Sequence, residues 1–117
     1  MGKSSFEDLL VWQESMRLTD IIYGLVKKLP KEEMFALSDQ MRRAAVSIPS
    51  NIAEGKSRNG DKEFKQFLYI ARGSTAELYT QLKICVRQNY LTEDEIAEAT
   101  EMCQSVGKMI NGLINSL

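Results

Sequence analysis

Apolar residues recur at intervals of three and four along most of the chain, which is the spacing of amphipathic helices. The pattern and its breaks predict four helices, at residues 7–29, 31–55, 61–88 and 92–117. Pro30 ends the first helix, and residues 56–60 have the composition of a loop. Thr92 and Glu95 form a capping-box pattern that opens the fourth helix. Short connections between four helices predict an all-α fold, an antiparallel up-and-down four-helix bundle.

The second predicted helix contains Pro49, yet its apolar stripe runs from Met34 to Ile52 without losing phase. We therefore expect one helix kinked at Pro49, the alternative being two short helices that meet there. Proline also leaves the Ala45 carbonyl without its helical donor. A polar stripe beside the apolar one could satisfy such exposed groups, pair across a subunit boundary or simply face solvent. The stripe comprises Gln40, Arg43, Ser47, Asn51 and Glu54.

The first predicted helix is apolar over an arc of roughly 200°, against a little over ~100° for an ordinary surface helix. Leu9, Trp12, Met16 and Tyr23 line one edge of this arc, and Val11, Leu18, Ile22, Leu25 and Leu29 line the other. A single bundle would leave part of the arc exposed, so the pattern favours self-association over a skewed monomer that buries it all. On the outer face of the third helix, Ile70, Gly73 and Ile84 are further candidates for contact with a second copy.

Composition narrows the class of protein. The chain has 117 residues, 44% of them apolar and 26% charged, which is typical of one folded domain spanning residues 1–117. No secretory signal pattern or long apolar span is evident, so we expect a cytoplasmic protein. Cys85 and Cys103 fall on the core stripes and are expected to be reduced and not joined by a disulfide.

The residue types argue against an enzyme. Histidine is absent, and two cysteines without other soft ligands do not make a metal site. Residues 55–57 (GKS) resemble the end of a phosphate-binding loop, but Ser50 stands where that motif needs glycine, and a helix precedes it instead of a strand. We therefore expect no catalytic residues, no cofactor, no metal, no small-molecule substrate and no membrane partner.

Charge is unevenly distributed although the net charge is only −1. Between residues 42 and 72 there are seven basic and three acidic residues, and the basic residues of the third helix fall within a sector of about 80°. A basic stripe with an aromatic residue inside it is typical of phosphate contact combined with base stacking, although solvated helix faces also show it. The candidate RNA contacts are Arg42, Arg58, Lys62, Lys65 and Arg72, with Tyr69 as a stacking platform.

Three segments carry a family resemblance: residues 6–9 (FEDL) with 11–13 (VWQ), residues 40–55 (QMRRAAVSIPSNIAEG) and residues 67–78 (FLYIARGSTAEL). They closely resemble the 23S rRNA-intervening-sequence proteins, often called four-helix bundle proteins. The family is similar in fold to the accessory variability protein of diversity-generating retroelements, a basic pentameric barrel that binds nucleic acid and a reverse transcriptase. The resemblance implies a bacterial, non-enzymatic bundle that forms a homopentamer. This chain departs from that basic relative in its pI of about 5.5.

The sequence therefore yields two functional hypotheses. The first is a non-catalytic oligomeric bundle that associates with structured RNA or a ribonucleoprotein. The second is a protein-interaction scaffold that does not bind nucleic acid.

Overall fold

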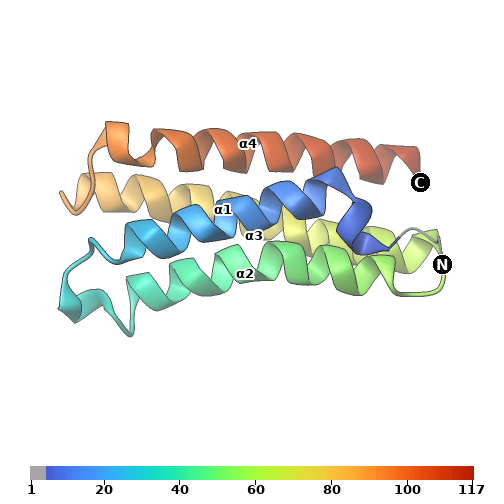
Figure 1. Ribbon diagram of the computed structural model, residues 1–117, viewed down its shortest axis with the longest axis horizontal. Coiled ribbons are helices and arrows are strands. Elements are labelled where there is room, and N and C mark those ends of the chain that lie inside the picture. Colours follow the sequence, from blue (N-terminus) through green and yellow to red (C-terminus); the bar gives the residue numbers. More distant parts are fainter. Residues whose placement is uncertain (1–4) are drawn as a thin grey trace.

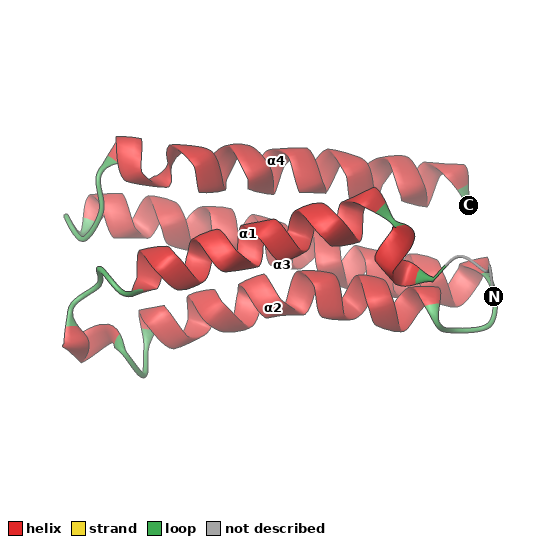
Figure 2. Cartoon of the chain, viewed as in Figure 1, coloured by secondary structure: helices red, strands yellow, loops and turns green. Residues whose placement is uncertain are grey.

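The computed structural model describes residues 5–117, and within that range it contains only helices, turns and loops (Figure 2). The elements are η1 (Phe6–Asp8), α1 (Leu10–Val26), η2 (Lys31–Glu33), α2 (Leu37–Lys56), α3 (Asp61–Arg87) and α4 (Glu93–Ser116), where η denotes a 3₁₀ turn. The predicted all-helical fold with four main helices is confirmed.

The four helices lie side by side along the long axis of a body measuring 45 × 23 × 22 Å (Figure 1). Helix α1 packs against α2 and α4, and α3 also packs against α2 and α4. Short connections lie at alternating ends of the molecule, so the α2–α3 loop and the C-terminus share one end (Figure 1). Fully buried side chains from all four helices, such as Ile22, Ile48, Leu78 and Ile110, form one core.

The first helix begins later than the sequence pattern predicts. Ser5 caps the short turn η1 by accepting a hydrogen bond from the Glu7 N–H at 3.1 Å, and the Asp8 carboxylate accepts one from the Ser5 N–H at 3.2 Å. The chain is extended at Leu9, so α1 starts at Leu10 rather than at residue 7. This local capping ends the turn before a continuous helix can form.

The second helix also begins later than predicted, at Leu37 instead of residue 31. The Glu33 carboxylate accepts hydrogen bonds from the Leu37 N–H at 3.2 Å and from the Tyr90 hydroxyl at 2.8 Å. It thereby caps α2 and ties the α1–α2 connection to the α3–α4 turn. Met34 falls in this connection and is 44% exposed, so its predicted place on the core stripe is wrong.

Helix α2 is continuous through Pro49 and ends at Lys56, one residue past the predicted end, while the kink at Pro49 stays a prediction. The Thr19 hydroxyl of α1 lies 3.3 Å from the Ala45 carbonyl, which proline deprives of its helical donor, and 2.8 Å from the Ser15 carbonyl. The side chain that reaches the freed carbonyl therefore comes from the neighbouring helix and not from the polar stripe of α2.

Helices α2 and α3 come close together at Gly55, the buried residue just before the end of α2. A Cβ added at Gly55 would lie 2.7 Å from the Phe67 Cβ and 3.0 Å from the Phe64 Cδ1. Carbon atoms in proteins pack at ~3.5–4.0 Å, so only glycine lets α2 and α3 approach this closely.

Helix α3 ends in a Schellman motif, in which Asn89 adopts a left-handed conformation with φ 63°. The Tyr90 N–H donates to the Cys85 carbonyl at 2.8 Å, and the Asn89 N–H donates to the Val86 carbonyl at 3.0 Å. The predicted capping box of α4 is confirmed, since Thr92 and Glu95 exchange side-chain to backbone hydrogen bonds. These bonds, followed by a hydrogen bond from Lys28, lower the pKa of Glu95.

Replacing Gly55 by alanine tests the close contact between α2 and α3. We expect Gly55→Ala to lower the free energy of unfolding by about 1–3 kcal/mol because the added methyl group collides with Phe67, although alanine favours helix formation. Gly112→Ala in α4 is the matched control, since nothing lies within 4 Å of its added Cβ. That control should gain up to about 1 kcal/mol in urea denaturation. Equal effects of the two substitutions would contradict the steric argument.

A double-mutant cycle tests the role of Thr19. We expect Thr19→Val to lower the free energy of unfolding by about 1 kcal/mol, because it removes the donor that reaches the Ala45 carbonyl. In a Pro49→Ala background the restored backbone N–H satisfies that carbonyl, so the same substitution should cost less. Chemical denaturation of the four proteins measures the coupling, and its absence would show that the Thr19 contact is incidental.

Candidate nucleic-acid interface

The structure places five of the six predicted RNA contacts along the α2–α3 loop and the first half of α3. These are Arg58, Lys62, Lys65, Tyr69 and Arg72. Lys56, at the end of α2, lies beside them. We call these five residues together with Lys56 the basic cluster.

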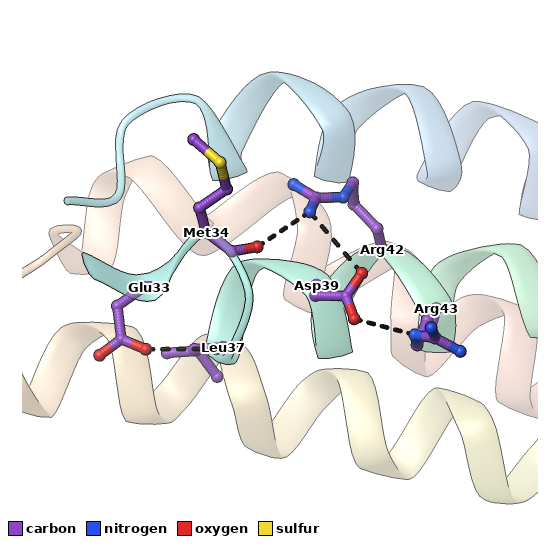
Figure 3. A network of polar contacts seen from close by, with 6 residues as sticks. All are labelled: Glu33, Met34, Leu37, Asp39, Arg42 and Arg43. Atoms are coloured by element: carbon purple, nitrogen blue, oxygen red, sulfur yellow. Dashed lines mark hydrogen bonds and ion pairs between the residues drawn. The ribbon is translucent and has the colours of Figure 1, made fainter. Parts of the chain in front are cut away.

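Arg42 lies apart from the basic cluster, because it is in the second turn of α2. Along a straight helix it is about 21 Å from Lys56. Its guanidinium donates to the Met34 carbonyl at 3.1 Å and lies 3.8 Å from the Asp39 carboxylate, which also accepts from Arg43 at 2.9 Å (Figure 3). The side chain of Arg42 thus closes the turn before α2, and the structure does not group it with the other candidates.

Basic side chains of this region lie over aromatic rings. The charged groups of Lys56 and Arg58 are 5.9 Å and 5.1 Å from the ring centres of Phe64 and Phe67. Arg72 lies 4.9 Å from the ring centre of Tyr69. Such cation–π contacts hold long side chains against the helix surface, which orders them before any ligand arrives.

The cations of the basic cluster differ in their availability. Arg58 forms a 2.7 Å ion pair with Glu54, and Arg72 donates to the Asn111 side chain at 2.9 Å. Lys56, Lys62 and Lys65 form no ion pair with any residue of the described range 5–117. Lys56 lies over the Phe64 ring, whereas Lys62 and Lys65 make no cation–π contact in that range. The two lysines, on successive turns of α3, are therefore the most available phosphate contacts.

The polar stripe of α2 is largely engaged within the chain. The Ser47 and Ser74 hydroxyls are 2.8 Å apart across the α2–α3 interface, and the Asn51 amide donates to the Ser47 carbonyl at 2.8 Å. Arg43 and Glu54 form the ion pairs described above. Gln40 is exposed. The stripe thus helps to pair α2 with α3, a role that its sequence pattern left undecided.

Apolar side chains are exposed on two faces. The edge of the α1 arc that contains Leu18 and Ile22 is buried. On the opposite edge Met16 is 41% and Tyr23 43% exposed, next to exposed Val46 of α2. On α3, Ile70 is 52% exposed, and Gly73 and Ile84 are also exposed. The predicted excess of apolar surface on α1 is confirmed in part, because Leu9 and Trp12 are half-buried.

Phe35, in the α1–α2 connection, is 89% exposed. The sequence pattern did not single it out, because it lies in a segment that was expected to be helical.

The thiols are poor candidates for chemistry. Cys85 and Cys103 are free and buried, as predicted. Burial, together with the charge of Glu33, raises the pKa of Cys85 to about 11, and burial raises the pKa of Cys103 to about 12. The nucleophilic thiolate is therefore scarce at neutral pH.

Metal-binding clusters and membrane-spanning helices are both absent from residues 5–117. No group of three or more His, Cys, Asp or Glu side chains in that range is placed to hold a metal ion. None of the helices there is both long and apolar enough to cross a membrane.

The fold and the surface therefore define a small all-helical protein with basic and aromatic side chains grouped at one end. Residues 7–112 match the family of 23S rRNA-intervening sequence proteins, and the chain belongs to that family. A crystal structure from Bacteroides thetaiotaomicron VPI-5482, described as a protein with unknown function from the S23 ribosomal protein family, is similar in fold. Its TM-score is 0.83 at 24% identity, over 90% of this chain and 98% of the other. A comparison with curated proteins found no significant match.

Proposed function

We propose that the protein is a non-catalytic, self-associating four-helix bundle that binds structured RNA or a ribonucleoprotein in the cytoplasm through the basic cluster. Its antiparallel up-and-down helices and a kink of α2 at Pro49 are part of this proposal. The observation that carries it is that Lys62 and Lys65 lie beside cations held over aromatic rings, along the α2–α3 loop and the first half of α3. Of the three rings only Tyr69 is exposed, at 48%, so it is the one suited to base stacking, while the cations are suited to phosphate contact.

Several copies of the basic cluster would strengthen this binding. The chain carries a net charge of −1, so attraction to RNA depends on the local cluster and not on the whole surface. Self-association places several clusters on one particle, and multivalency then raises the overall affinity without any new contact. The exposed apolar side chains Met16, Tyr23 and Ile70 support self-association. The number five comes from the resemblance to the pentameric retroelement protein.

The same apolar surfaces support the second hypothesis, a protein-interaction scaffold. Contiguous apolar side chains on a surface are typical of protein contacts, and Phe35 adds a further one. In that case the basic cluster serves only as a solvated end of the bundle.

Salt dependence distinguishes the two hypotheses. We expect the protein to bind a fluorescent RNA hairpin with an affinity that falls steeply as salt rises. Replacing both Lys62 and Lys65 by glutamine should reduce the slope of log K against log salt by about 1.4–1.8, since each lost phosphate contact contributes about 0.7–0.9. The control Lys27→Gln with Lys31→Gln makes the same charge change at exposed positions near the opposite end. Equal slopes in the two double variants, or no binding at low salt, would favour the scaffold.

Light scattering during size exclusion tests self-association. We expect a particle mass that is a multiple of the 13.3 kDa chain mass at micromolar concentration. Val46→Glu places a charge beside the exposed side chains of Met16 and Tyr23, and Ile70→Glu places one on the exposed face of α3. Each substitution should lower the particle mass if that face forms the interface. Circular dichroism verifies that the variants remain helical. A monomeric mass for the unmodified protein contradicts self-association.

A further inference from the structure

An open groove runs between α3 and α4, with a volume of about 670 Å³. Small residues create it, because Ala76 of α3 and Gly107 of α4 line it where larger side chains would fill the space. A Cβ added at Gly107 would still lie 3.7 Å from the nearest atom, the Thr75 hydroxyl, so close backbone packing does not require glycine there. The absence of a side chain at this position keeps the groove open.

The groove is free of acidic side chains. Its lining includes Lys108, Asn111 and Tyr79, and none of the lining residues is Asp or Glu. The whole of α4 from residue 102 onward contains no acidic residue. Glu77, the one acidic residue of α3 after Glu63, is hydrogen-bonded by the Gln81 amide at 3.3 Å, and neither of these two residues lines the groove. The groove therefore favours a negatively charged occupant.

The groove and the basic cluster form a continuous surface. Arg72 belongs to the cluster and donates to Asn111, which lines the groove, so it lies where the two meet. Beyond it, half-buried Tyr79 lines the groove, and the Lys83 ammonium, which pairs with Glu93 at 3.6 Å, lies 5.7 Å from its ring centre. From Lys62 to Tyr79 the helix rises about 26 Å, the length of about eight stacked nucleotides at ~3.4 Å each.

We propose that this groove holds a single-stranded segment of the bound RNA, in which Lys108 contacts a phosphate and Tyr79 stacks on a base. The inference rests on the proposed function and extends it to residues outside the basic cluster. Stacking on an aromatic side chain needs a base that is not already paired and stacked in a helix, so an RNA duplex cannot use the groove. The Asn111 oxygen accepts from Arg72, which leaves its N–H groups to donate, and the Thr80 hydroxyl donates to the Ala76 carbonyl, which leaves its oxygen to accept.

Fluorescence anisotropy with the full chain tests the groove. The probes are a labelled 12-nucleotide unstructured RNA and a 12-base-pair RNA duplex. We expect Tyr79→Leu to weaken binding of the single strand about 5- to 150-fold and Tyr79→Phe to retain it, because stacking is worth that much per base and needs only the ring. Lys108→Gln should reduce the salt slope for the single strand by about 0.7. Duplex binding should not change in these variants.

The outcomes separate the groove from the basic cluster. If Lys62→Gln weakens single-strand binding while Tyr79→Leu and Lys108→Gln bind like the unmodified protein, the groove is not the site and the proposed function stands. If groove variants weaken the duplex and the single strand equally, the assignment to single strands is wrong. If the unmodified protein binds neither RNA at about 50 mM salt, both proposals fail. Should Tyr79→Leu unfold, Lys108→Gln decides, because that side chain is exposed.

Discussion

The contact of Gly55 with α3 positions much of the candidate interface. Its backbone reaches Phe64 and Phe67, and these are the same two rings over which Lys56 and Arg58 lie. A larger residue at position 55 would push the end of α2 away from the rings that hold these cations. One steric constraint therefore joins helix packing to the placement of charge at this end of the bundle.

Helix α2 is matched to its neighbours by polar contacts on both sides. The Thr19 hydroxyl of α1 approaches the Ala45 carbonyl on one side, and Ser74 of α3 meets Ser47 on the other. Polar contacts between packed helices have directional requirements that apolar packing lacks, so they specify the register of α2. The Thr19 hydroxyl has one proton and lies closer to the Ser15 carbonyl, at 2.8 Å, so the Ala45 carbonyl receives only the longer contact of 3.3 Å.

Periodicity was enough to predict the four helices, the buried edge of α1 and the core positions of both cysteines. It failed at Met34, because the Glu33 carboxylate caps α2 at Leu37 and leaves Met34 in a turn. It also missed Thr19 and the α3–α4 groove. A hydrogen bond between helices depends on their relative register, and a groove depends on which small residues face each other. Neither quantity is encoded in the spacing of apolar residues along one helix.

The charge of this chain varies locally although its net charge is only −1, and helix α4 shows this most clearly. Five acidic residues lie in the first half of α4, from Glu93 to Glu101, and none follows. That first half lies at the end of the molecule opposite the α2–α3 loop (Figure 1). Since screening limits electrostatic interactions in physiological salt to about 8 Å, these carboxylates act on near neighbours such as Lys28 and Lys83 and scarcely on the basic cluster.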